Sequence, residues 1–212
     1  MQYSVVIPTM WKAPRQLKEM LLTYEECPLV YEVLLIDNIG LPRHKVSKYS
    51  KVEVLNDGVN LFVNPSWNLG VEKAKCEKII LANDDIYIEE FNQLLYLVDA
   101  CLRKGIIVGV DKECFAKKRT AALGDIEMHL ANGERGYGFG VFMILYKESY
   151  VPIPEQLKVW YGDTLLYNSL DPYLIKGVDV QTEMRTTSKT MNLRMQHKYE
   201  TKYFQLYCNG SN

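Results

Sequence analysis

The sequence predicts an α/β fold in which a mostly parallel central sheet carries helices on both faces. Short apolar runs of the kind that form buried strands alternate with longer segments whose apolar residues recur on one face of a helix. Over the first 110 residues these segments follow the order β-α-β-β-α-β-α-β. Such alternation is typical of parallel sheets whose strands are joined by crossover helices.

Each predicted element depends on a local pattern. The first strand is a β-rich run that stops at Pro8, and the helix after it carries apolar residues at i, i+3, i+4 and i+7. The second strand is apolar throughout, as in a strand buried on both faces, and Asp37-Asn38 follows it. The third strand ends in the turn signal Asn56-Asp57-Gly58. In chain order we expect strand 3–7, helix 15–24, strand 33–36, strand 52–55, helix 65–74, strand 78–82, helix 89–103 and strand 106–110.

The second half of the chain is less regular. Residues 112–135 are polar and charged without a sustained period, which predicts a long loop. Residues 136–146 begin with glycines and become apolar, which indicates a strand entered through a tight turn, and residues 159–170 favour a helix. The tail from residue 182 to residue 197 is polar and weakly periodic.

Composition excludes several classes of protein. The chain has 212 residues, 48% hydrophobic and 24% charged, which is typical of a globular core with a solvated surface rather than of disorder. A balance of 25 basic and 26 acidic residues provides no overall positive field for nucleic acid. No apolar run is long enough for a transmembrane segment, and the N-terminus does not resemble a signal peptide. Five cysteines without CxxC spacing favour a reducing compartment, so we expect the cytoplasm.

Polar side chains follow three of the predicted strands. In an open parallel sheet, ligands bind outside the carboxyl ends of the strands. Two adjacent carboxylates repel each other unless a cation or a hydrogen-bonding ligand stabilises them, and hard ions such as Mg²⁺ or Mn²⁺ share oxygen ligands with phosphates. The alternative reading of Asp84-Asp85 is an ordinary turn or helix cap. The residues at the three strand ends are Pro8 and Thr9, Asp37 and Asn38, and Asn83, Asp84 and Asp85.

Common catalytic and cofactor motifs are missing from the sequence. Neither GxGxxG nor GxxxxGK[ST] occurs, which argues against a dinucleotide-dependent oxidoreductase and a P-loop ATPase. GxSxG and HExxH are also absent, which argues against a serine hydrolase of the α/β type and a zinc protease.

Several segments resemble the GT-A fold glycosyltransferases of family 2. The opening SVVIPTMWK is similar to their first strand and turn, and VLLIDN to their second strand. The stretch NPSWNLGVEKAKCEKIILANDDIYIEE contains an Asn-x-Gly motif at residues 68–70 and ends in a DxD-type motif at residues 83–85. The resemblance covers the first 110 residues and becomes patchier through YGFGVFMILYKESYVPIPE and VWYGDTLLY. The opening also resembles virus-encoded capsid glycosyltransferases, which would place the chain in a host cytoplasm.

The resemblance implies a nucleotide site. Asp37 would accept a hydrogen bond from the imide nitrogen of a uracil or thymine ring, and Asp84 would reach the ribose. The other implied nucleotide-binding residues are Pro8, Thr9, Asn68 and Asn83.

The resemblance also implies a Mn²⁺ or Mg²⁺ cofactor and a catalytic base. Asp85 would bind the metal that bridges the two phosphates, and His197 would be an additional ligand. Asp163 matches the catalytic aspartate, and the neighbouring Trp160 and Tyr161 are candidates to stack on a sugar ring. An inverting transfer needs one carboxylate to take the proton of the acceptor hydroxyl, while the metal stabilises the departing diphosphate.

Two positions depart from the family pattern. Gly162 stands where the family usually has glutamate before the catalytic aspartate, and Trp67 stands where many members have arginine. Lys12 or the cluster Lys117-Lys118-Arg119 would supply the positive charge that Trp67 lacks.

The sequence thus predicts a single GT-A domain over residues 1–212, with a nucleotide-sugar-binding half (1–110) and an acceptor-side half (111–212). The expected activity is a metal-dependent, inverting hexosyl transfer from a nucleoside-diphosphate sugar to a hydroxyl of a glycan or glycoprotein. UDP is the first candidate for the nucleotide of the donor, and glucose or rhamnose for its sugar. Two alternatives remain. One is a sugar-nucleotide nucleotidyltransferase, whose glycine-rich phosphate loop is missing here. The other is a non-catalytic nucleotide-sugar-binding or glycan-binding domain, which Gly162 leaves open.

Overall fold

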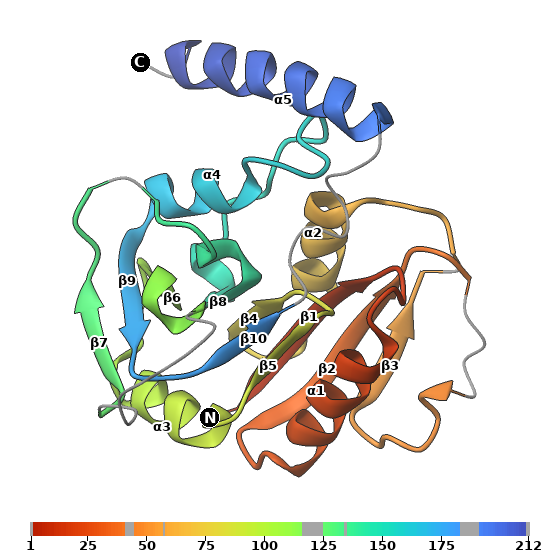
Figure 1. The fold of residues 1–212 in the computed structure, drawn as a ribbon, viewed down its shortest axis with the longest axis vertical. Coiled ribbons are helices and arrows are strands. Elements are labelled where there is room, and N and C mark those ends of the chain that lie inside the picture. Colours follow the sequence, from red (N-terminus) through yellow and green to blue (C-terminus); the bar gives the residue numbers. More distant parts are fainter. Residues whose placement is uncertain are drawn as a thin grey trace.

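A mixed, mostly parallel sheet forms the centre of the structure, a computed structural model that describes residues 2–40, 45–56, 58–115, 125–133, 135–182 and 191–210 (Figure 1). Within these ranges eight strands join in the order β3-β2-β1-β4-β8-β6-β9-β7, and β5 and β10 form a small second sheet. The strands are β1 (Tyr3–Thr9), β2 (Val30–Asp37), β3 (Val52–Leu55), β4 (Lys78–Ala82), β5 (Ile86–Ile88), β6 (Ile106–Val110), β7 (Glu127–Leu130), β8 (Phe142–Tyr146), β9 (Asp171–Lys176) and β10 (Val180–Thr182).

Strand direction places several strand ends at one edge of the sheet. β1 pairs in parallel with β2 and β4, and β2 with β3. β8 runs antiparallel to both β4 and β6, so β6 has the same direction as β4. The carboxyl ends of β1, β2, β4 and β6 therefore lie at the same edge, where the sequence predicts the ligand site.

Helices cover both faces of this sheet, as predicted. Val5 and Ile7 of β1 belong to one core, with apolar side chains of α1 and α3, while Val6 belongs to the other, with side chains of α2 and α4. In Figure 1, α1 and α3 lie in the lower half and α2 and α4 in the upper half. The alternation arises because successive side chains of a strand point to opposite faces. The helices of the described residues are α1 (Pro14–Glu26), α2 (Val63–Lys73), α3 (Phe91–Cys101), α4 (Gly162–Ser169) and α5 (Met191–Gly210).

Most of the predicted elements are confirmed. β3, β4 and β6 have the predicted bounds, and β8 follows a tight turn at Gly138, whose φ is 85°. The first strand continues beyond the predicted stop at Pro8 and ends at Thr9. This is possible because β4 pairs only with Tyr3–Val6, and a proline is tolerated where one side of a strand has no partner.

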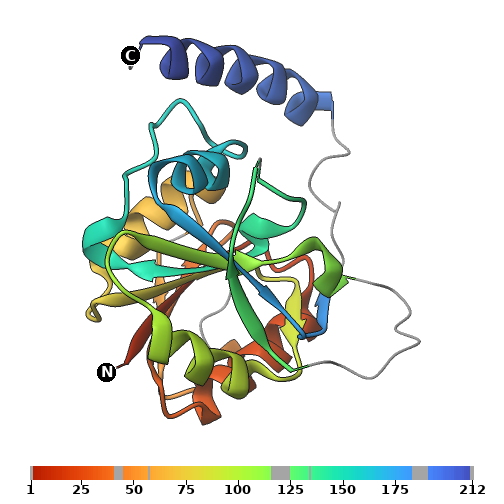
Figure 2. The same cartoon turned by 90° about the vertical axis from the view of Figure 1, so that its left-hand side faces the viewer.

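One prediction about the second half was wrong, and one helix was not predicted. The segment 112–135, expected to be a loop, contains the 3₁₀ helix η2 (Lys112–Phe115) and the edge strand β7. The polar tail leads into the long helix α5, which lies at the top of both views, apart from the sheet (Figures 1 and 2). None of the helices in the described ranges combines the length and the apolar character needed to cross a membrane.

Candidate functional site

Three strand ends meet at the carboxyl edge, as the sequence predicts. Thr9 and Asp37 are the last residues of β1 and β2 and are partners in the strand register. The N–H of Asn38 donates to the carbonyl of Thr9 at 3.0 Å. The Thr9 hydroxyl donates to Oδ2 of Asp84, which follows β4, at 2.5 Å. The structure therefore brings Thr9, Asp37 and Asp84 together across three strands.

Thr9 also shapes the turn that leaves β1. Its hydroxyl oxygen accepts the N–H of Trp11 at 2.9 Å while its proton goes to Asp84. Trp11 has a φ of 53°, in the left-handed region that non-glycine residues seldom adopt. Strained backbone of this kind persists where the surrounding structure fixes it and is frequent at functional sites.

Burial raises the pKa of the Asp84 carboxyl. The Thr9 hydroxyl, the N–H of Met10 and the charge of Lys12 oppose this effect and favour the ionised form. Lys12, predicted as a source of positive charge, thus lowers the pKa of Asp84. Its contact with a phosphate stays a prediction. Asp85, the next residue, is 9% exposed. Two adjacent carboxyl groups are therefore held at a largely dehydrated strand end.

Asp37 is 2% exposed and closes the turn after β2. Its Oδ1 accepts the N–H groups of Ile39 and Gly40, both at 3.0 Å. Its predicted hydrogen bond to a nucleobase stays a prediction, and so does the predicted contact of Pro8, which pairs with Ile36 in the strand register.

The Asn-x-Gly motif has a structural role in this protein. The Asn68 amide donates to the carbonyl of Ile153 at 2.8 Å, and its oxygen accepts the Tyr150 hydroxyl at 2.7 Å and the N–H of Ile153 at 3.0 Å. A Cβ at Gly70 would lie 2.1 Å from Cγ1 of Val6, so only glycine lets α2 approach β1 this closely. Asn68 therefore fastens the segment before α4, and its predicted contact with a nucleotide stays a prediction.

Asp163 lies at the start of α4 and beside the end of β4. A Cβ at Gly140 would lie 2.3 Å from Oδ2 of Asp163, so the carboxyl rests against that glycine. The next residue, Val141, accepts the backbone N–H of Asn83 at 2.9 Å. The segment 138–141 thus links Asp163 to the DxD-type strand end, although residues 83 and 163 are far apart in the sequence.

An ion pair missed by the sequence analysis holds Asp163. Nη1 of Arg135 lies 2.9 Å from Oδ2 of Asp163, and Nε of Arg135 donates to the Thr164 hydroxyl at 3.0 Å. Burial raises the pKa of the Asp163 carboxyl, and the charge of Arg135 opposes that rise. The available signal was a single basic residue at the end of a segment interpreted as a loop, and nothing in the sequence connects it with Asp163.

Packing explains the glycine at position 162. A Cβ there would lie 2.2 Å from Oδ1 of Asn64 and 2.8 Å from Cδ1 of Ile153. The Asn64 side chain is fixed, because its amide donates to the carbonyls of Leu157 and Trp160, each at 3.0 Å. A glutamate at position 162, as in the family pattern, would not fit. Trp67, the second departure, is 3% exposed and belongs to the core on the α2 face.

Helix α5 covers the aromatic residues before α4. The His197 ring packs edge-on against Trp160, with centroids 4.9 Å apart, and stacks on Tyr161 at 6.0 Å. Phe204 stacks on the same Tyr161 ring at 4.8 Å. Glu200 is fully buried and accepts the backbone N–H of Trp160 at 2.8 Å. Trp160 and Tyr161 are thus engaged in docking α5, and their predicted stacking on a sugar stays a prediction.

Solved structures share this architecture. Residues 1–349 of S. aureus TarS in complex with UDP-GlcNAc match with a TM-score of 0.65 and 13% identity, over 90% of this chain and 61% of that one. The same protein in complex with UDP matches with a TM-score of 0.61 and 16% identity, over 85% of this chain and 59% of that one. GalNAc-T7 with UDP, GalNAc and Mn²⁺ matches with a TM-score of 0.58 and 14% identity, over 86% of this chain and 44% of that one.

The chain has the GT-A fold. Identities this low show the fold alone, and the chain spans about six-tenths of the length of the TarS 1–349 structures. Neither a scan against protein-family models nor a search of curated proteins finds a match.

Asp84 and Asp85, which follow β4, suit a divalent ion that is shared with a substrate. Among the described residues, no group of three or more His, Cys, Asp or Glu side chains gathers to hold a metal, so Asp85 and His197 form no such cage there. Mg²⁺ and similar ions are commonly held by one or two carboxylates plus substrate phosphates, so such a cage is not required. A cation beside Asp84 would compensate the burial that disfavours its ionised form. The cluster Lys117-Lys118-Arg119 lies outside the described residues.

Proposed function

We propose that this chain is a nucleotide-sugar-dependent glycosyltransferase. One observation carries the proposal: Asp163 and the Asp84 strand end flank the same short segment, 138–141, on a GT-A fold. On one side, the dehydrated carboxyl groups after β4 are suited to bind a metal and a nucleotide. On the other side, the Asp163 carboxylate is suited to act as a base. The likeness to TarS, which was solved with UDP and with UDP-GlcNAc, supports this arrangement.

In this proposal Asp163 is the general base. Its carboxylate would accept the proton of an acceptor hydroxyl as that oxygen attacks the anomeric carbon, and the bond to the leaving diphosphate breaks. A positioned base of this kind contributes about 10²–10⁴-fold to the rate. Burial, which raises the pKa of Asp163, makes it a stronger base, while the Arg135 ion pair keeps it ionised and oriented. A single base with no covalent nucleophile corresponds to inversion at the anomeric carbon.

Asp85, with Asp84 beside it, would hold Mn²⁺ or Mg²⁺. A bound divalent ion supplies a Lewis acid that stabilises the negative charge of the departing diphosphate. The presence of Mn²⁺ in the GalNAc-T7 structure supports this assignment. His197 remains the candidate for an additional ligand.

The donor in this proposal is UDP-linked. Glucose and rhamnose are the first candidates for its sugar, and the TarS complex adds N-acetylglucosamine. The acceptor is a hydroxyl group of a glycan or glycoprotein.

Calorimetric titration with UDP, with and without Mn²⁺, tests the proposal. We expect Mn²⁺-dependent binding to the wild-type protein and its loss in Asp85→Ala. Asp171→Ala is the matched control, because Asp171 is an exposed aspartate at the start of β9, away from the carboxyl edge. Absence of UDP binding under every metal condition would overturn the proposal.

Turnover is tested separately by the release of UDP from UDP-glucose, UDP-rhamnose and UDP-GlcNAc. We expect one donor to be hydrolysed faster than the others in the presence of Mn²⁺. UDP binding without turnover of any donor, with or without added glycosides, would instead support the non-catalytic binding domain.

A further inference from the structure

An exposed aromatic residue belongs to the same stretch of chain as two residues that contact Asp163. Tyr137 is 55% exposed and belongs to the turn that leads into η3 (Phe139–Val141). It stands two residues after Arg135 and three before Gly140, and both of these residues contact Asp163. Two residues of chain span at most about 7 Å, so the Tyr137 backbone lies within that distance of Arg135.

The Tyr137 ring is supported from within the protein. It packs edge-on against Phe115, with centroids 6.3 Å apart and an interplanar angle of 73°. Phe115 in turn covers Gly138, where a Cβ would lie 2.3 Å from the phenylalanine ring. Gly138 also has a φ of 85°, so both its conformation and the lack of space require glycine. The turn therefore presents a supported ring with more than half of its surface open to solvent.

Two different segments of chain lead to Asp163. The nucleotide-side residues Thr9 and Asp84 reach Asp163 through Asn83 and Val141. Tyr137 precedes the segment 138–141 and stands between Arg135 and Gly140, the two residues of this stretch that contact Asp163. A base must lie within hydrogen-bond reach of the hydroxyl that it deprotonates, so the acceptor lies beside Asp163 and extends over neighbouring surface.

We infer that Tyr137 is the platform on which the acceptor sugar stacks. An aromatic face suits the apolar C–H face of a pyranose ring, and a supported side chain loses little conformational entropy on binding. Tyr137 differs in this from Trp160 and Tyr161, the stacking candidates of the sequence, whose rings pack against α5. The acceptor is thus a pyranose glycan rather than an acyclic polyol or a simple alcohol. This inference rests on the proposed function and adds the class of acceptor.

Saturation-transfer NMR with a panel of methyl hexopyranosides tests the inference, in the presence of UDP and Mg²⁺. Sorbitol, which has hydroxyls but no ring face, is the negative ligand. We expect a pyranoside to bind the wild-type protein through its C–H face, and Tyr137→Ala to bind it about tenfold more weakly, as loss of one apolar contact surface predicts. Tyr137→Phe should bind as the wild type does.

Tyr96→Ala is the matched control, because Tyr96 on α3 is 54% exposed and remote from Asp163 in the fold. It should leave pyranoside binding unchanged, and all variants should bind UDP as the wild type does. Unaltered pyranoside binding in Tyr137→Ala would overturn the inference, and so would equal loss in Tyr96→Ala or sorbitol binding as strong as pyranoside binding. UDP binding with no pyranoside bound would overturn this inference alone, whereas absence of UDP binding would overturn the proposed function as well.

Discussion

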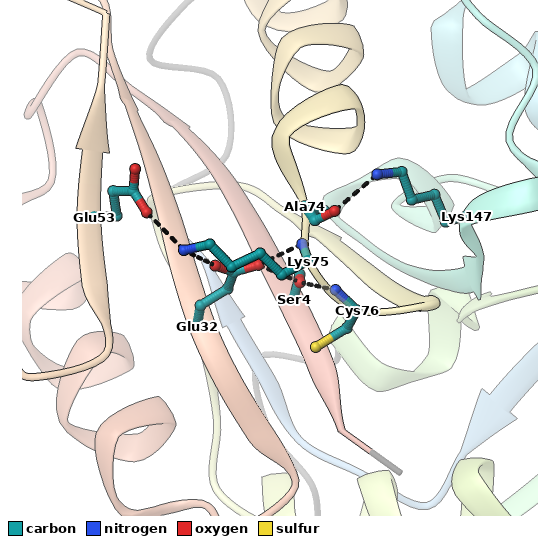
Figure 3. A network of polar contacts seen from close by, with 7 residues as sticks. All are labelled: Ser4, Glu32, Glu53, Ala74, Lys75, Cys76 and Lys147. Carbon is teal, nitrogen blue, oxygen red and sulfur yellow. Dashed lines mark hydrogen bonds and ion pairs between the residues drawn. The ribbon is translucent and has the colours of Figure 1, made fainter.

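Buried carboxyl groups have different surroundings at the two edges of the central sheet. At the amino edge, Glu32 of β2 is 4% exposed and receives hydrogen bonds from the Ser4 hydroxyl at 2.6 Å and the N–H of Lys75 at 2.7 Å. The Lys75 ammonium pairs with Glu32 at 3.0 Å and with Glu53 at 3.1 Å (Figure 3). This network fastens the connection between α2 and β4.

At the carboxyl edge, the partners of the buried carboxyl groups offset their dehydration only in part. Burial raises the pKa of Asp84 and of Asp163, although each receives hydrogen bonds or an ion pair. Carboxyls whose pKa values are perturbed by burial and that gather at strand ends are characteristic of functional sites. Exposure alone therefore does not distinguish Glu32, to which we assign a structural role, from the carboxyl groups that we assign to the ligand site.

The largest expected effect tests Asp163. Asp163→Asn should lower transfer by about 10²–10⁴-fold, because the amide cannot accept the proton, and it should leave UDP binding unchanged. Initial rates of UDP release in the presence of an acceptor measure transfer. Calorimetric titration measures UDP binding. Asp171→Asn is the control. Unchanged transfer in Asp163→Asn would remove Asp163 from the catalytic role.

Glu32→Gln should destabilise the protein without touching the ligand edge. The change removes a buried negative charge that pairs with Lys75, and a charged hydrogen bond of this kind is worth about 2 kcal/mol. Urea denaturation measures the loss of unfolding free energy. Impaired UDP binding by the folded variant would break the proposed division between the two edges.

Asp84→Asn should have the opposite effect on stability. Because the pKa of Asp84 is raised in the folded protein, folding binds a proton there, and the ionised carboxyl costs stability as pH rises above the ordinary aspartate range. The variant should therefore unfold a few degrees higher than the wild type at neutral pH. The difference should shrink as pH falls through the ordinary aspartate pKa of about 3.9 and vanish well below it, where the carboxyl is protonated in both states. Thermal unfolding at several pH values measures it, and a variant less stable than the wild type at neutral pH would contradict it.

The smallest expected effect concerns Arg135. Its charge lowers the pKa of Asp163, so Arg135→Gln should raise that pKa and move the acidic limb of the pH–rate profile to higher pH. We expect a several-fold rate loss on the acidic limb that recovers as pH rises. Arg135→Lys, which keeps the charge, should move the limb less. An equal loss at every pH would indicate a structural role instead.

The core of the fold was predictable because its signals are local. β3, β4 and β6 are short segments rich in Val, Ile and Leu, and their bounds were predicted correctly. The strand-end residues Thr9 and Asp84 follow from the rule that parallel strands end at one edge.

The remaining features depend on contacts between distant segments. Helix α5 was missed because its inward face depends on the buried Glu200 and on His197, which interrupt the apolar periodicity that marks a helix. Arg135 was missed because its partner, Asp163, lies on another element. The requirement for glycine at position 162 depends on where Asn64 packs, which only the folded structure shows.

Calorimetric titration of Asp84→Asn and Glu32→Gln with UDP and Mn²⁺, side by side with the wild type, tests the central claim most directly. Both changes convert one buried carboxyl into an amide, at opposite ends of the same sheet. We expect Glu32→Gln to bind UDP with wild-type affinity and Asp84→Asn to bind it more weakly. Equal affinities in the two variants, or loss in Glu32→Gln alone, would contradict it.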